Sequence, residues 1–298
     1  MDAAKFPTLD PELAPVLAFL PDMTEGMNDL EGARAMLKNI VPTGPVPGEE
    51  SLDVTDIESE GTRLRVYRPR TGTTKGVLYL HGGGFCLGDL DMEHGGAVQI
   101  ANEVDAIVVS VDYRLAPEHP YPAGLDDCMN GLRYLSGLVD KLAVHGQSAG
   151  GGLGAATVLR ARDEGGPAIA FQSLGIPELD HRLETPSMQQ FVDTPLWARP
   201  QAVKSWEYYL GGQPADGYAS PAIMDDLSGL PPAHVTVMEL DPLRDEGIAY
   251  ATRMLQAGVS VELHAYPGTF HGSSLVQDAA VSRRQAADLI GALRRGLA

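Results

Sequence analysis

The chain has 298 residues, 44% of them hydrophobic, and a formal net charge of −18. This length and composition predict a globular protein with a large buried core. Nucleic acids and anionic membrane surfaces would repel so acidic a chain, so neither is expected as a partner. No apolar run approaches the ~20 residues that cross a bilayer, and the first 13 residues lack a basic region followed by an apolar stretch. We therefore expect a cytoplasmic protein.

Cysteine and histidine spacing gives no sign of a disulfide framework or a metal site. The two cysteines, Cys86 and Cys128, are too few for such a framework and lie far apart. No His-x-x-x-His or Cys-x-x-Cys pair occurs. Two free thiols, no metal and no cofactor are expected.

Taken in chain order, apolar helical segments in residues 1–45 come first and end in a stretch rich in proline and glycine. Short apolar runs then alternate with amphipathic ones, which predicts an α/β fold with a mostly parallel sheet flanked by helices. Strands are predicted at 63–68, 76–81, 106–112, 142–146, 168–174, 234–240 and 259–266. Helices are predicted at 92–104, 125–136, 151–164, 243–257 and 278–297.

Two stretches do not join this alternation, and we expect them to form a helical cap over the active edge of the sheet. They are residues 1–45 and a proline-rich insertion at 177–232 that carries both tryptophans. The core would then comprise residues 46–176 and 233–298.

The segment Gly146-Gln-Ser-Ala-Gly150 lies between a predicted strand and a predicted helix. Glycines on both sides of Ser148 permit a sharp turn that holds its hydroxyl at the start of the helix. Ser148 is therefore a candidate nucleophile. An alternative is that Gly150 to Ala155 is a dinucleotide-binding loop, but that motif needs an acidic residue ~20 positions later at the end of a second strand. Asp163 and Glu164 come too early for that role.

A run of three glycines follows His81 directly after a predicted strand. Their unshielded amides could approach a substrate carbonyl, so Gly83 and Gly84 join Ala149, the residue after the candidate nucleophile, as predicted oxyanion donors. His81 itself is expected to anchor this loop by hydrogen bonds.

A serine nucleophile needs a base and an acid that orients the base. Asp241 and His271 each follow a predicted strand, in the chain order Ser, Asp, His. Asp245, one helical turn beyond Asp241, is an alternative acid. His145 is predicted to be a packed strand residue.

These motifs resemble the hormone-sensitive-lipase-like (bacterial family IV) carboxylesterases of the α/β-hydrolase fold. The resemblance also includes Asp112-Tyr-Arg-Leu-Ala-Pro-Glu118 and Asp241-Pro-Leu-Arg-Asp245. Gln147, Ile176-Pro-Glu-Leu-Asp180 and Phe191 to Trp197 resemble its heroin-esterase-like, acetyl-ester-hydrolysing branch. Ser273 stands where the wider family often has an aromatic residue.

The resemblance implies a serine esterase for small esters of short acyl groups, with a cap that sets specificity and a homodimeric assembly. The predicted substrate-binding residues are aromatic: Trp197, Trp206, Phe85 and Phe191. An amidase that uses the same triad stays open, as does a small-molecule receptor on the same fold. An intact Ser148, Asp241 and His271 set favours the enzyme.

Overall fold

A single eight-stranded sheet forms the centre of the computed structural model, which describes all residues except 21–22, 41–43 and 45. The strand order is β1-β2-β4-β3-β5-β6-β7-β8, with β1 and β2 antiparallel to their neighbours and the remaining pairs parallel. The strands are β1 (Leu52–Ser59), β2 (Thr62–Pro69), β3 (Lys75–Leu80), β4 (Ile107–Asp112), β5 (Lys141–Gln147), β6 (Phe171–Gly175), β7 (Ala233–Leu240) and β8 (Val261–Phe270). The predicted α/β fold is confirmed.

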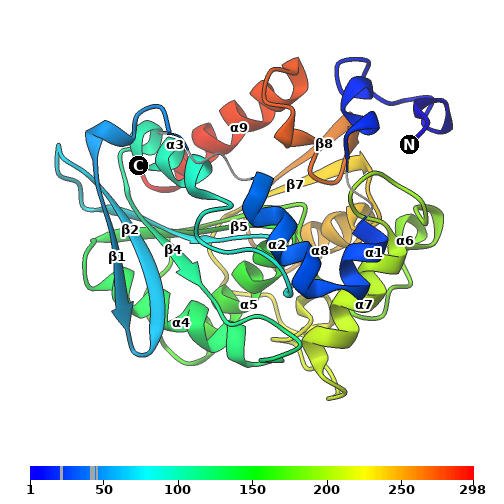
Figure 1. Cartoon of the computed structure of the whole chain (residues 1–298). Helices are drawn as coiled ribbons and strands as arrows, with labels where there is room; N and C mark the ends of the chain where they lie inside the picture. The colour runs from blue at the N-terminus through cyan, green and yellow to red at the C-terminus, as the bar shows by residue number, and fades with distance from the viewer. Residues whose placement is uncertain (21–22, 41–43, 45) are drawn as a thin grey trace.

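Helices cover both faces of this sheet (Figure 1). On one face lie α3 (His94–Val104) and α9 (Ala280–Gly296), and on the other lie α4 (Ala123–Ser136), α5 (Ala149–Asp163) and α8 (Arg244–Gln256). The central strands are buried almost throughout because helices pack on both sides of them. Each of the five predicted core helices is present, with bounds shifted by a few residues.

The first strand, β1, is absent from the sequence-based prediction. It lies at the sheet edge and pairs with β2 alone, from Leu52 opposite Pro69 to Ser59 opposite Thr62. Half of its residues face solvent, and several of these are acidic. An edge strand needs only a partial apolar face, so it carries a weaker hydrophobic signal than a central strand.

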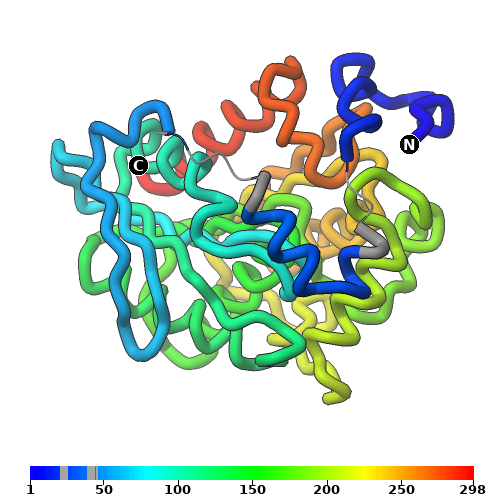
Figure 2. The backbone as a smooth tube through the Cα atoms, viewed as in Figure 1, coloured from blue at the N-terminus to red at the C-terminus, as the bar shows by residue number. Residues whose placement is uncertain are grey.

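The two stretches predicted as a cap lie next to each other in space. The N-terminal stretch contributes α1 (Met23–Asn28) and α2 (Leu30–Ile40), and the insertion contributes α6 (Pro186–Gln190) and α7 (Arg199–Leu210). Helix α1 packs against α7, and Figure 2 shows the blue N-terminal segment beside the yellow-green segment of the insertion. The division of the chain into core and cap stays a prediction.

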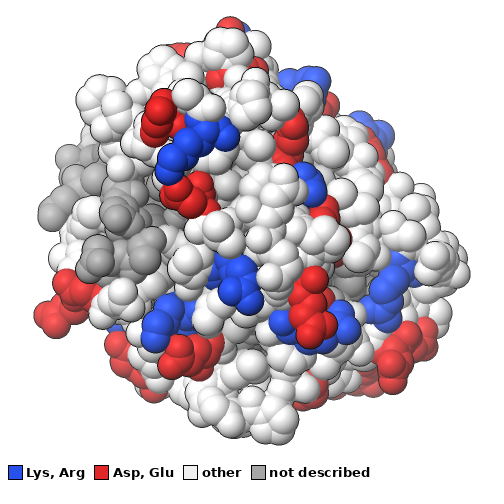
Figure 3. All heavy atoms as spheres, turned by 90° about the vertical axis from the view of Figure 1, so that its right-hand side faces the viewer, with Lys and Arg blue, Asp and Glu red and all other residues white. Residues whose placement is uncertain are grey.

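Charges of both signs are mixed on the face shown in Figure 3, which includes part of this region. Lysine and arginine side chains lie among acidic ones, with uncharged surface between them. Among the described residues, no helix is both long and apolar enough to cross a membrane.

Candidate active site

Ser148 occupies a tight turn between β5 and α5, with φ 56° and ψ −124°. Neighbouring backbone approaches so closely that side chains are excluded on both sides: an added Cβ at Gly146 would lie 2.1 Å from Gly150 O, and one at Gly150 would lie 2.1 Å from Leu80 O. Positive φ is unfavourable for serine, so the surrounding packing must hold this conformation. The turn presents the hydroxyl at the N-terminus of α5.

The side chains of Ser148, His271 and Asp241 form one hydrogen-bonded row. Ser148 Oγ lies 2.9 Å from His271 Nε2, and His271 Nδ1 lies 2.7 Å from Asp241 Oδ2. A carboxylate can only accept, so His271 donates from Nδ1 and its Nε2 is free to accept the serine proton. Asp241 also accepts a hydrogen bond from Leu243 N at 2.9 Å, which fixes the carboxylate. All three side chains are buried.

The competing carboxylates near Asp241 are engaged elsewhere. Asp245 accepts hydrogen bonds from Ser187 N and from Arg244, and so supports the start of α6. Glu239 accepts one from Gly268 N at 2.7 Å. Asp241 is therefore the carboxylate in position to orient His271.

The loop after β3 brings free amides to the same place as the turn. Within the described chain, the N–H groups of Gly83, Gly84 and Ala149 have no hydrogen-bond acceptor. Gly82 lies next to the turn, since an added Cβ there would be 3.4 Å from Ser148 Cβ. Three unpaired donors beside a candidate nucleophile can stabilise negative charge on a substrate oxygen.

His81 anchors this loop, as the sequence analysis predicted. Its Nδ1 donates to Gly82 O at 2.8 Å, and its ring stacks on Tyr113 with centroids 4.0 Å apart. Tyr113 in turn donates its hydroxyl proton to His81 O. Burial lowers the pKa of His81 to about 4, so it is neutral at physiological pH.

His145 is a packed strand residue, again as predicted. It is buried, its Nδ1 lies 3.2 Å from Ser173 O, and burial lowers its pKa to about 4.

The four predicted substrate-binding aromatics occupy different places. Trp197 borders the site, because its ring centroid lies 5.8 Å from that of His271 and its Cη2 would be 2.5 Å from a Cβ added at Gly84. Phe85 and Trp206 pack together with Tyr209 in a buried hydrophobic cluster that also includes Ala149.

Phe191 lies in a separate hydrophobic cluster with residues of β7, β8 and the N-terminal segment, and Arg244 stacks over its ring. That packing accounts for the burial of Phe191, and its contact with substrate stays a prediction.

Two contacts that tie the cap to the core were not identified from the sequence. Arg34 of α2 makes a two-fold ion pair with Glu118, at 2.7 and 2.9 Å, and donates to Cys86 O and Ala116 O. Arg34 and Glu118 are 84 residues apart along the chain, so no local sequence pattern reveals that they pair.

The second cap contact involves Glu178, which is fully buried and accepts a hydrogen bond from Ser205 of α7 at 2.7 Å. Its own N–H donates to Ser148 O at 3.1 Å. Burial raises the pKa of Glu178 to about 8, against the opposing effect of the Ser205 hydrogen bond.

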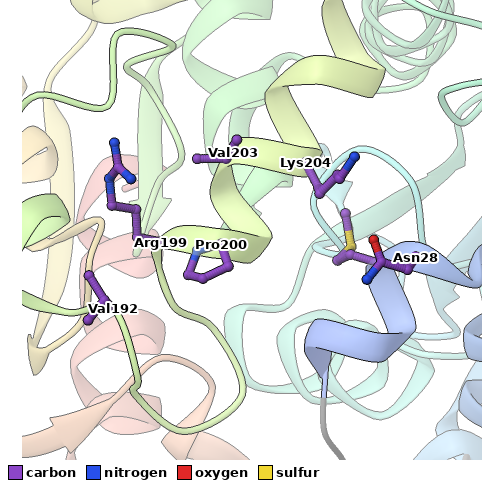
Figure 4. Close-up of a pocket in the computed structure, with 7 residues that line it drawn as sticks. Asn28, Val192, Arg199, Pro200, Val203 and Lys204 are labelled. Carbon is purple, nitrogen blue, oxygen red and sulfur yellow. The ribbon is translucent and has the colours of Figure 1, made fainter.

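A pocket of about 460 Å³ opens between α1 and the first turns of α7 (Figure 4). Its lining is Met27, Asn28, Val192, Arg199, Pro200, Val203 and Lys204. It lies between segments of the predicted cap, and its lining includes none of the three hydrogen-bonded side chains. Mostly apolar lining suits the apolar part of a small organic molecule.

Comparisons with known proteins identify the family of this chain. A family model described as the alpha/beta hydrolase fold matches residues 77–275. The solved structure of bacterial heroin esterase is 46% identical, covers 99% of each chain and superposes with a TM-score of 0.93. Carboxylesterase NlhH of Mycobacterium tuberculosis is 39% identical over 89% of each chain, and ethyl acetate hydrolase of Pseudomonas putida is 32% identical over 74% of each. The chain therefore belongs to the hormone-sensitive-lipase-like family of α/β hydrolases, among its carboxylic ester hydrolases.

Proposed function

We propose that this protein hydrolyses esters of short carboxylic acids, with Ser148 as nucleophile, His271 as general base and acid, and Asp241 as the residue that orients His271. The row of hydrogen bonds from Ser148 through His271 to Asp241, at 2.9 and 2.7 Å, carries this proposal. The same row argues against a receptor without catalytic activity, because such a protein has no need of an aligned base and acid.

In the first half of the reaction, Ser148 Oγ attacks the ester carbonyl carbon while its proton passes to His271 Nε2. The carbonyl electron pair moves to oxygen, where the amides of Gly83, Gly84 and Ala149 would stabilise it. The intermediate then collapses, the bond to the alcohol oxygen breaks, and that oxygen takes the proton from His271. An acyl group remains on Ser148.

In the second half, a water molecule attacks the acyl carbon and gives its proton to His271. The second tetrahedral intermediate expels Ser148 Oγ, which recovers the proton, and the carboxylic acid leaves. Throughout, the buried carboxylate of Asp241 stabilises the imidazolium that forms on His271.

A short acyl group is favoured by two observations. Trp197 lies over the glycine loop and beside His271, so its ring takes up space next to the reacting carbon. In addition, one relative is named for the hydrolysis of ethyl acetate, an acetyl ester.

The proposed function is tested with p-nitrophenyl acetate, butyrate and octanoate, and with p-nitroacetanilide as the amide. We expect wild-type activity to be highest on acetate or butyrate, and the Ser148→Ala variant to lose several orders of magnitude in kcat. Near-normal turnover by the variant would reject the mechanism. An optimum on octanoate would reject the short acyl group, and faster cleavage of the amide would favour an amidase.

A homodimer in the cytoplasm completes the proposal. Among the described residues, no strand pairs with the outer edge of β8, and an unpaired edge can pair with a second copy of the chain. Both cysteines are free and buried, as is usual in a reducing compartment. Light scattering on the purified protein measures the assembly, and a monomeric mass at micromolar concentration would reject it.

A further inference from the structure

Two histidines and a glutamate gather at the amino ends of β7 and β8, far from the triad. His234 of β7 pairs in register with Glu262 of β8, and His264 follows Glu262 by two residues. Side chains two apart on a strand point to the same face, so all three share one face of the sheet. One ligand atom from each lies within 4.8 Å of the other two.

His234 has one ring nitrogen without a partner. The side chain is 1% exposed, its Nδ1 lies 3.2 Å from Ser173 Oγ, and its Nε2 has no hydrogen-bond partner in the described chain. Leaving a buried polar atom unpaired costs folding free energy, so an unpaired nitrogen of this kind needs an explanation. A metal ion that accepts the lone pair of His234 Nε2 would provide that explanation.

His264 and Glu262 are held by neighbours in the way that metal ligands usually are. Asp288 of α9 lies 3.3 Å from His264 Nδ1, which leaves Nε2 facing Glu262 Oε1 at 2.9 Å. The other oxygen of Glu262 accepts a hydrogen bond from Arg295 at 2.6 Å. A carboxylate behind the imidazole and a hydrogen-bonded ligand carboxylate are typical surroundings of protein metal sites.

We propose that His234 Nε2, His264 Nε2 and Glu262 Oε1 bind a Zn²⁺ ion, with a water molecule as fourth ligand. Two imidazoles and one carboxylate suit Zn²⁺, whereas Ca²⁺ and Mg²⁺ prefer oxygen ligands alone. Ligand atoms of tetrahedral zinc lie about 3.3 Å apart, so the pairs that include His234 have to close by roughly 1.5 Å at most, and the 2.9 Å pair of His264 and Glu262 has to open slightly. The side chains of His264 and Glu262 are partly exposed, at 28% and 39%, and have room to make that movement.

The proposed ion would connect strands rather than take part in ester hydrolysis. Six residues of β7 lie between His234 and Asp241, and the seven steps from one to the other span about 23 Å along an extended strand. Asp241 and His271 follow β7 and β8 at their other ends. Zinc bound here therefore stabilises the pair of strands that position the proposed acid and base, and leaves the reaction itself unchanged.

The test uses tag-free protein treated with EDTA and then dialysed, titrated with ZnCl₂ by calorimetry and with Co²⁺ by visible absorption. Glu262→Gln and His264→Gln each remove one proposed ligand, and His119→Gln removes an exposed histidine outside the cluster as a control. We expect one zinc per chain and tetrahedral Co²⁺ bands in wild type and in the control. Each ligand variant should bind at least 10-fold more weakly.

Stability and activity provide independent readouts. At a zinc concentration 100-fold above Kd, the melting temperature of the wild type should rise by roughly 5 °C, with no such rise in His264→Gln and no change in kcat. The proposal is overturned if the wild type shows no saturable binding, or if both ligand variants bind as tightly as the control. It is also overturned if zinc inhibits wild type and His264→Gln equally, which would place the ion at His271.

Discussion

The predicted core and the predicted cap meet at the same site, but they contribute different kinds of contact. In the core, the site depends on close backbone approaches around Ser148, such as the one between Gly146 and Gly150. The predicted cap contributes one side chain, the ring of Trp197, and one backbone contact, from the N–H of Glu178 to Ser148 O. We therefore expect changes in the core to affect the chemical step, and changes in the cap to affect substrate binding and stability.

The largest expected effect is that of Asp241→Asn in the core. An asparagine can donate to His271 Nδ1 and so favour the wrong tautomer, in which Nε2 carries the proton and cannot accept one from Ser148. We expect kcat for p-nitrophenyl acetate to fall by ~10⁴-fold. Asp245→Asn is the matched control, because Asp245 bonds to Ser187 and Arg244. Asp245→Asn should keep nearly normal kcat. If Asp245→Asn lost activity instead and Asp241→Asn did not, Asp245 would be the orienting acid.

A smaller loss is expected from Gly84→Ala in the glycine loop. The backbone φ of Gly84 is 56°, and the added methyl group would lie 2.5 Å from Trp197, so either the loop or the tryptophan must move. Loss of one amide donor costs ~10²–10³ in kcat. Stopped-flow or steady-state hydrolysis of p-nitrophenyl acetate measures this loss.

Gly95→Ala is the control for this glycine, because Gly95 lies in α3 and nothing lies within 4 Å of its added Cβ. That variant should keep its activity and should be slightly stabilised, since alanine favours a helix over glycine. Full activity in Gly84→Ala would show that the loop accepts the methyl group without displacing its amides, and would contradict the expected loss.

In the cap, Arg34→Ala should have a moderate effect. Arg34 joins α2 to Glu118 and to two core carbonyls, and its loss leaves those acceptors without their donor. We expect faster proteolytic cleavage within the first 45 residues and a rise in KM of about 3- to 10-fold, with kcat nearly constant.

Arg70→Ala removes an ion pair with Asp53 in which both side chains are about 60% exposed, and such pairs contribute little. Arg70→Ala should therefore resemble wild type both in its rate of proteolytic cleavage and in KM. Equal rates of proteolytic cleavage in Arg34→Ala and Arg70→Ala would mean that Arg34 does not hold the N-terminal segment in place.

The contacts at the site differ in whether the sequence can predict them. The turn at Ser148 and the glycine loop are local, so a few consecutive residues reveal them. Asp241 and His271 could be placed because both follow strands of a parallel sheet, whose carboxyl ends share one edge.

Contacts across the fold leave no such local signal. Arg34 and Glu118 come from different elements, and either could have had another partner. The zinc site proposed here was missed for the same reason: a search by spacing within one segment finds Glu262 and His264 but not His234, which β7 brings from 28 residues away.

The smallest effect on activity is expected from Glu178→Gln, which tests the burial of the Glu178 carboxyl beside Ser205 through the pH dependence of stability. In the unfolded chain this carboxyl ionises near its ordinary pKa of 4.5, whereas burial raises the folded pKa to about 8. Between these values the folded state retains a proton that the unfolded state has lost. The free energy of unfolding therefore falls as pH rises from about 4.5 to about 8, by at most ~1.4 kcal/mol per pH unit.

Glutamine keeps the shape of the side chain and does not titrate, so Glu178→Gln should be more stable than wild type, by a margin that grows between pH 5.5 and pH 8. Melting curves across that range measure the margin, and the exposed Glu184→Gln is the control in the same insertion. Hydrolysis of p-nitrophenyl acetate should change little, because Glu178 bonds to the turn through its backbone and to Ser205 through its side chain. A constant margin at every pH would mean that the Glu178 carboxyl ionises alike in the folded and unfolded chains, and that burial does not raise its pKa.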